Sequence, residues 1–218
     1  MSAPTRVIAS LGVGPHEALL RLAAATIEPY ARRHGYALEL HTGVVDATRP
    51  APWSKVRILR DLVDRHEIVV WLDADLEIVD PRVDIASELD PGSFLGIVEH
   101  RYRASQFPNS GVMVLRGGER AAGFLDEVWA LDAYIDHTWW ENAAICELLG
   151  YGLDPPRRLA TTAWRDQTTF LSPSWNWIVN APLHRARIRH FPGFALRTRT
   201  ILMRAALVEA RARSLVWR

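Results

Sequence analysis

A continuous apolar run that ends in two acidic residues is the feature that most constrains the fold of this chain. Residues 68 to 72 are Ile, Val, Val, Trp and Leu, and Asp73 and Asp75 follow directly. An unbroken apolar run of this kind is typical of a parallel strand that is covered on both faces. Ligands of open α/β sheets bind at the carboxyl ends of such strands. The two carboxylates are therefore expected at a ligand-binding edge of a sheet.

The segments on either side of this run alternate between strand-like and helix-like patterns. Apolar residues recur at helical spacing after Gly14, where Gly35 is expected to end the helix, and again after Ser54, which is placed to cap the next helix. With 218 residues, 49% of them hydrophobic, the chain can bury one compact core. The pattern predicts a single α/β domain with a mostly parallel central sheet, flanking helices and a C-terminal helix at about residues 198–214. Strands are predicted at residues 6–11, 36–41, 68–72, 94–98, 111–115 and 188–190, and further helices near residues 119–131 and 139–149.

Charge and composition give no support to several other classes of protein. The formal net charge is +1, so nothing favours nucleic-acid binding. No apolar run approaches the roughly 18 residues of a membrane span, and the first residues lack the pattern of a signal peptide. The only cysteine, Cys146, has no partner for an internal disulfide. These features predict a soluble, cytoplasmic protein and leave its oligomeric state open.

One basic residue stands out against the composition. Of the 26 basic residues, Lys55 is the only lysine, and all the others are arginine. One interpretation is that a compact ammonium is needed at this position because a planar guanidinium does not fit there. The other is chance at a solvent-exposed helix start. The sequence leaves the two interpretations equally open.

The acidic pair has two possible roles when it is considered without any relative. Asp73 and Asp75 are two residues apart, so in an extended or turning backbone their carboxylates can converge on one hard cation. Aspartate is also common where strands become turns, so a metal or nucleotide site and a solvated turn are equally open. Taken alone, His190 is an ordinary strand-end histidine, Glu141 an acid at a helix start, and Asn109 part of a turn.

Five short motifs lie in order between residues 53 and 193. They are Trp53-Ser54-Lys55, Trp71-Leu72-Asp73-Ala74-Asp75, Asn109-Ser110-Gly111, Trp139-Trp140-Glu141-Asn142-Ala143-Ala144 and His190-Phe191-Pro192-Gly193. Taken together, these motifs resemble those of GT-A glycosyltransferases. The chain is most similar to family 34, the galactosyl-, xylosyl- and mannosyltransferase group, although Asn142 stands where that family usually has Gln. The resemblance implies a Rossmann-like GT-A fold in one domain, with donor binding in about residues 1–116 and acceptor binding and catalysis in about residues 117–196.

The resemblance also implies a metal site and a set of residues around it. Asp75 would ligate a divalent cation, Asp73 would share the cation and the ribose hydroxyls, and His190 would be a third ligand. An imidazole beside two carboxylates favours Mn²⁺ over Mg²⁺. The other residues implied at the site are Asn109, Glu141 and Asn142 as catalytic residues, and Ser10, Gly12, Lys55, Gly111 and Gly193 as donor-binding residues together with Asp73.

The function implied by the resemblance is transfer of a sugar from a nucleotide diphosphate sugar to a carbohydrate or other hydroxyl-bearing acceptor, with retention of anomeric configuration. The polar, proline-bounded run around Trp175, Asn176 and Trp177 is expected to line the cleft. The sequence leaves open an inactive nucleotide-sugar binding module, a sugar-nucleotide phosphohydrolase and a nucleotidyltransferase. It does not predict the nucleobase, the sugar or the acceptor.

Overall fold

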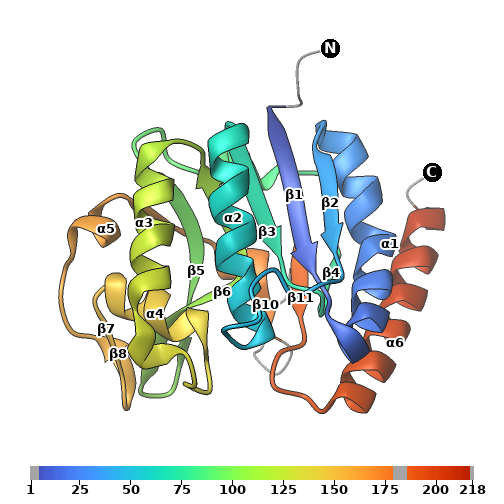
Figure 1. Ribbon diagram of the computed structural model, residues 1–218. Helices are drawn as coiled ribbons and strands as arrows, with labels where there is room; N and C mark the ends of the chain where they lie inside the picture. Colours follow the sequence, from blue (N-terminus) through green and yellow to red (C-terminus); the bar gives the residue numbers. More distant parts are fainter. Residues whose placement is uncertain (1–4, 179–185, 217–218) are drawn as a thin grey trace.

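The computed structural model describes residues 5–178 and 186–216, which form a mixed α/β fold around a six-stranded sheet (Figure 1). The strand order is β2-β1-β3-β6-β5-β9. Two strands, β1 and β3, have the bounds that their apolar runs predict. The strands of this sheet are β1 Arg6–Leu11, β2 Ala37–His41, β3 Ile68–Leu72, β5 Leu95–Tyr102, β6 Ser105–Arg116 and β9 Thr168–Leu171.

Most neighbouring strands in this sheet are parallel, and β6 is the exception. β1 pairs in parallel with β2 and β3, and β5 pairs in parallel with β9. β6 runs antiparallel to both of its neighbours, β3 and β5. The cause is the connection between β5 and β6, because only Arg103 and Ala104 separate them and so short a link joins antiparallel strands. The mostly parallel sheet predicted from the sequence is confirmed.

Helices cover both faces of the sheet (Figure 1). The core on one face includes residues of α2 (Ser54–Arg65), α3 (Glu119–Ala130) and α4 (Glu141–Leu148), and the core on the other includes residues of α1 (Glu17–His34) and α6 (Leu196–Val216). Successive residues of a strand point to opposite faces, so Val7 and Ala9 join the first core and Ile8 joins the second. A short helix, α5 (Ala163–Asp166), precedes β9. None of the helices in the described stretches is both long and apolar enough to cross a bilayer.

Two predicted helix boundaries have different outcomes. Gly35 follows α1 with a φ of 71°, a left-handed conformation that suits glycine and ends the helix as predicted. The prediction that Ser54 caps α2 is wrong, because Ser54 is already the first residue of that helix. Its hydroxyl instead accepts a hydrogen bond from the backbone N–H of Val45 at 3.0 Å, which holds the preceding loop. The chain enters α2 through the 3₁₀ turn Ala51–Trp53, so no side-chain cap is used there.

A second, three-stranded sheet brings the late part of the chain to the end of β3. Its order is β10 (Trp177–Ile178), β11 (Ile188–His190) and β4 (Leu76–Ile78). β11 pairs antiparallel with β4, which puts His190 opposite Leu76. Because β4 follows Asp75 directly, this pairing places His190 beside the acidic pair. A separate hairpin is formed by β7 (Tyr151–Leu153) and β8 (Pro156–Arg158).

Candidate metal and nucleotide site

A large irregularity in the pairing of β5 with β6 shapes the site. Ile97 pairs with Met113, but the next residue, Val98, pairs with Asn109, so the residues between Asn109 and Met113 leave the β5 ladder. The carbonyl of Gly111 accepts a hydrogen bond from Asp73 N at 2.8 Å instead. The segment expected to be a turn that opens the strand is therefore a bulge inside β6, which begins at Ser105. Bulges of this kind redirect side chains next to functional sites.

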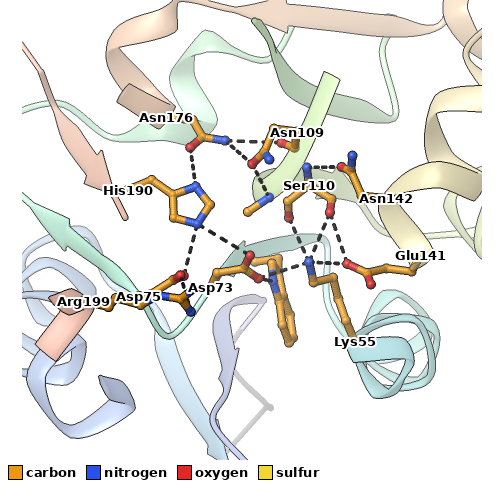
Figure 2. A network of polar contacts seen from close by, with 12 residues as sticks. Lys55, Asp73, Asp75, Asn109, Ser110, Glu141, Asn142, Asn176, His190 and Arg199 are labelled. Carbon is orange, nitrogen blue, oxygen red and sulfur yellow. Dashed lines mark hydrogen bonds and ion pairs between the residues drawn. The ribbon is translucent and has the colours of Figure 1, made fainter. Parts of the chain in front are cut away.

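Three of the predicted site residues converge beside this bulge, as Figure 2 shows. Asp73, Asp75 and His190 each offer one ligand atom, and these atoms lie within 4.8 Å of one another. His190 Nε2 is 3.1 Å from Asp75 Oδ1 and 3.8 Å from Asp73 Oδ2. The backbone supports this contact, because Phe191 N donates to the carbonyl of Asp75 at 3.0 Å. Two carboxylates and an imidazole are a donor set that suits a transition metal such as Mn²⁺.

The orientation of the His190 ring is set by Asn176. The Nδ2 of Asn176 donates to Asn109 Oδ1 at 2.9 Å, so its Oδ1 faces His190 Nδ1 at 2.8 Å. His190 Nδ1 is therefore the donor in this contact, and Nε2 faces the carboxylates. An unprotonated Nε2 and a carboxylate oxygen at 3.1 Å repel each other unless a proton or a cation lies between them. This arrangement fits a metal site in which the other ring nitrogen of the histidine ligand is hydrogen-bonded to a neighbouring side chain, here Asn176.

Gly111 is needed because β6 passes very close to the His190 ring. A Cβ at Gly111 would lie 2.8 Å from His190 Nδ1, 2.9 Å from Asn109 Oδ1, and closer still to His190 Cε1. Only a glycine leaves room for the imidazole in this position. The structure thus places Gly111 behind a proposed ligand, in van der Waals contact with the ring.

Lys55 lies at the centre of a buried polar network (Figure 2). Its Nζ is 2.7 Å from Glu141 Oε1 and 3.1 Å from Asp73 Oδ1, and it donates to the hydroxyl of Ser110 at 3.1 Å. Burial opposes a charged lysine, but the carboxylates of Asp73 and Glu141 outweigh burial and raise the pKa of Lys55. The interpretation of Lys55 as a solvent-exposed residue is wrong. The ammonium joins the acidic pair after β3 to the start of α4, and Trp71 Nε1 donates to the same Asp73 oxygen at 2.7 Å.

The predicted catalytic residues lie on the other side of this lysine. Glu141 is buried, and its Oε2 has no hydrogen-bond partner among the described residues. Asn142 uses both ends of its amide within the protein, accepting from Ser110 N at 2.7 Å and donating to the carbonyl of Pro108 at 3.3 Å. Asn109 Oδ1 accepts from Gly111 N at 3.0 Å as well as from Asn176. In this structure Asn142 therefore holds the β6 bulge in place.

The remaining predicted donor-binding residues lie at the same edge of the sheet without contacting the acidic pair. Ser10 and Gly12 come at the end of β1, which is the neighbour of β3. Ser10 is fully buried, and Gly12 N donates to His41 O at 2.9 Å. Gly193 lies in the turn after β11 with a φ of 77°. The expectation that Trp175 lines a cleft is wrong, because its side chain is fully buried in the core beneath α1 and α6.

Two residues in contact with the acidic pair and its histidine had no assigned role in the sequence. Arg199, on α6, lies 2.9 Å from Asp75 Oδ2 through its Nη1. In the sequence it is one of many arginines, and nothing distinguishes it from its neighbours. Asn176 was expected only in a loop at the cleft. The one signal for it is its place in a short polar run between two tryptophans, of which Trp175 is buried and Trp177 is half-buried.

Comparisons with known proteins identify the fold. No protein-family model matches the chain, and no curated protein matches it. A solved glycosyltransferase involved in glycosylation of the major capsid of PBCV-1 has a TM-score of 0.69 at 20% identity, covering 91% of this chain and 99% of that one. Galactosyltransferase LgtC, solved with donor and acceptor sugar analogues, has a TM-score of 0.56 at 10% identity, with 91% and 95% covered. Mouse xyloside xylosyltransferase 1 has a TM-score of 0.51 at 10% identity, with 86% and 98% covered.

These similarities extend over nearly the full length of all three solved proteins. In this chain, Asp73, Asp75 and His190 lie at the carboxyl end of the parallel strands. At such low identity the likeness establishes architecture, and it does not assign the chain to family 34. The chain has the fold of the GT-A glycosyltransferases.

Proposed function

We propose that this chain is a metal-dependent glycosyltransferase that moves a sugar from a nucleotide diphosphate donor to an acceptor hydroxyl. The observation that carries the proposal is the convergence of Asp73, Asp75 and His190 within 4.8 Å, at the carboxyl end of β3, on a GT-A fold. His190 is separated from Asp75 by 115 positions in the sequence. No requirement of local folding brings them together, so a shared ligand is the simplest physical reason for the cluster.

The residues present fit a divalent cation. Asp73, Asp75 and His190 would hold it, with Mn²⁺ favoured by the nitrogen ligand. A bound divalent cation supplies a Lewis acid that stabilises the negative charge of a leaving diphosphate. Asn176 fixes the His190 ring so that Nε2 is the free nitrogen, and Gly111 leaves room for that ring.

The other residues have proposed roles that follow from their positions. Lys55 keeps Asp73 and Glu141 close together although both carry negative charge. The unpartnered Oε2 of Glu141 and the side-chain amide of Asn109 are the polar groups proposed to face the transferred sugar. The edge formed by Ser10, Gly12 and Gly193 is proposed to bind the nucleotide, within the predicted donor-binding part at residues 1–116 and the turn after β11.

Retention of anomeric configuration is also proposed, and it depends on the resemblance of the motifs to family 34. Nuclear magnetic resonance of the first product formed from a donor of known anomeric configuration tests it. A product of the same configuration as the donor is expected. An inverted product would contradict retention and leave glycosyl transfer itself intact.

A thermal-shift panel tests the function most directly. Purified protein is incubated with nucleoside diphosphates and their sugar conjugates, each with and without Mn²⁺, and the best donor is then tested for Mn²⁺-dependent release of its sugar. One class of nucleotide is expected to raise the melting temperature only when Mn²⁺ is present, because binding to the folded state alone stabilises it.

Asp75→Asn, which keeps the size of the side chain and removes its charge, is expected to abolish both the Mn²⁺-dependent shift and sugar release. The control is Asp64→Asn, an exposed acid on α2 that forms an ion pair with Arg60. The control should behave like the wild type. Full activity of Asp75→Asn, or a wild type that binds no nucleotide with Mn²⁺, would contradict the proposed function.

A further inference from the structure

The carboxylate of Asp75 already has a positively charged group of the protein beside it, the guanidinium of Arg199 (Figure 2). Its Oδ1 faces His190 Nε2 at 3.1 Å, and its Oδ2 faces Arg199 Nη1 at 2.9 Å. The Asp75 side chain is 11% exposed and that of Arg199 is 16% exposed, so water screens the pair poorly. The carboxylate of Asp75, which is proposed to bind a cation, therefore already lies next to the permanent positive charge of Arg199.

The guanidinium of Arg199 is held in place but only partly used. Its Nη2 donates to the carbonyl of Phe194 at 3.0 Å, which ties the fork to the turn before α6. Its Nε is buried and has no hydrogen-bond partner among the described residues. An arginine has five N–H donors, and a planar fork of this kind is suited to binding phosphate oxygens. Arg199 thus has donor capacity that its contacts within the protein do not satisfy.

A divalent cation and the guanidinium compete for the same carboxylate. Both are positive, and both would lie within a few ångströms of Asp75, so each weakens the binding of the other. A diphosphate reverses this relation, because it brings negative charge that can pair with the cation and the guanidinium together. The charges around Asp75 therefore disfavour a cation that arrives alone and favour one that arrives with a diphosphate.

We infer that Arg199 is the resident counter-ion of Asp75. Its guanidinium pairs with Asp75 in the absence of metal, and when a divalent cation binds it exchanges this pair for one with the diphosphate of the donor. The inference rests on the proposed function, since it requires a cation and a diphosphate at this site. It makes Arg199 a coupling residue, whose removal should change metal affinity and diphosphate affinity in opposite directions.

The test is Arg199→Gln, which keeps a side-chain amide donor and removes the charge. Isothermal titration first measures Mn²⁺ binding alone, and then binding of UDP, GDP or ADP, whichever the wild type prefers, at saturating Mn²⁺. We expect Mn²⁺ alone to bind about tenfold more tightly and the nucleoside diphosphate about tenfold more weakly than to the wild type, each a change of about 1.4 kcal/mol. Arg199→Met, which keeps the packing of the stem, replaces the glutamine variant if that does not fold.

The matched control is Arg197→Gln, on the same turn of α6, because Arg197 is exposed and has no ion pair with any residue in the described ranges. Its affinity for Mn²⁺ alone should equal that of the wild type. If Arg199→Gln weakens the binding of both Mn²⁺ and the nucleoside diphosphate, the residue has only a structural role. If the affinity for Mn²⁺ alone is unchanged, the guanidinium does not compete with the cation for Asp75. Either result overturns the inference. A wild type that binds neither Mn²⁺ nor any nucleoside diphosphate contradicts the proposed function itself, which distinguishes the two failures.

Discussion

Replacement of Lys55 by methionine tests whether the buried network at the centre of the site depends on this one charge. Methionine keeps an unbranched side chain of similar length and removes the ammonium. In its absence the carboxylates of Asp73 and Glu141 remain close together, and Glu141 is buried. Breaking a buried ion pair by removing one partner costs about 3–5 kcal/mol, because the remaining charge is left without compensation.

For a domain of this size, each kcal/mol corresponds to a change in melting temperature of about 2–4 °C, so Lys55→Met should lower it by roughly 6–20 °C. Urea denaturation at pH 7 in the presence of a chelator measures the free energy of unfolding without any contribution from bound metal. The control is Arg65→Met, on the same helix, whose ion pair with Asp61 at 2.5 Å is largely exposed. That variant should lose no more than about 1 kcal/mol. Equal losses for the two variants would refute the assignment of a buried, structurally required charge to Lys55.

Lys55→Arg separates the need for a charge from the need for a compact charge. The lysine Nζ meets Glu141, Asp73 and Ser110 at distances of 2.7 to 3.3 Å, so there is no space for the larger planar group without displacement of its neighbours. Overpacking of this kind typically costs about 1–3 kcal/mol. We expect Lys55→Arg to be less stable than the wild type and more stable than Lys55→Met. If the arginine variant is as stable as the wild type, position 55 does not require a compact ammonium, and the single lysine of the sequence is there by chance.

Two further predictions concern residues around His190. Gly111→Ala should lower Mn²⁺ affinity at least about tenfold in titration, because the new Cβ would lie 2.8 Å from His190 Nδ1 and displace the ring. An unchanged affinity would mean that His190 is not a ligand. Burial, and to a smaller extent the charge of His190, lowers the pKa of His100 from 6.5 to about 4. The unfolded chain then takes up this proton at a higher pH than the folded chain, so stability should fall by up to about 3 kcal/mol as pH drops from about 6.5 to about 4. His100→Phe should remove this part of the pH dependence in urea denaturation, and an unaltered slope would contradict the assignment.

The strands of the central sheet that carry the strongest apolar runs could be predicted from the sequence. β3 has the predicted bounds because burial on both faces favours a continuous apolar run, and β1 has them although Arg6 and Ser10 interrupt its apolar residues. The full length of β6 and its bulge could not be predicted. The polar segment at Asn109 is typical of a turn, and it remains in the strand only because its amide groups bond to α4, to Asn176 and to the loop after β3. Such long-range contacts override local turn propensity.

The site residues likewise fall into those that local sequence pattern predicts and those that only tertiary contacts bring to the site. The sequence placed Asp73 and Asp75 at the sheet edge by local pattern alone, whereas His190 entered only through the resemblance to a family. Arg199 was not found at all, because an arginine on a polar helix has the same local pattern whether it meets solvent or a buried carboxylate. What brings these groups together is the antiparallel pairing of β11 with β4 and the packing of α6 against α1. The charge balance at Asp75 is therefore a property of the tertiary structure, and substitution of Arg199 in α6 is expected to alter metal binding although this residue lies far from the acidic pair in the sequence.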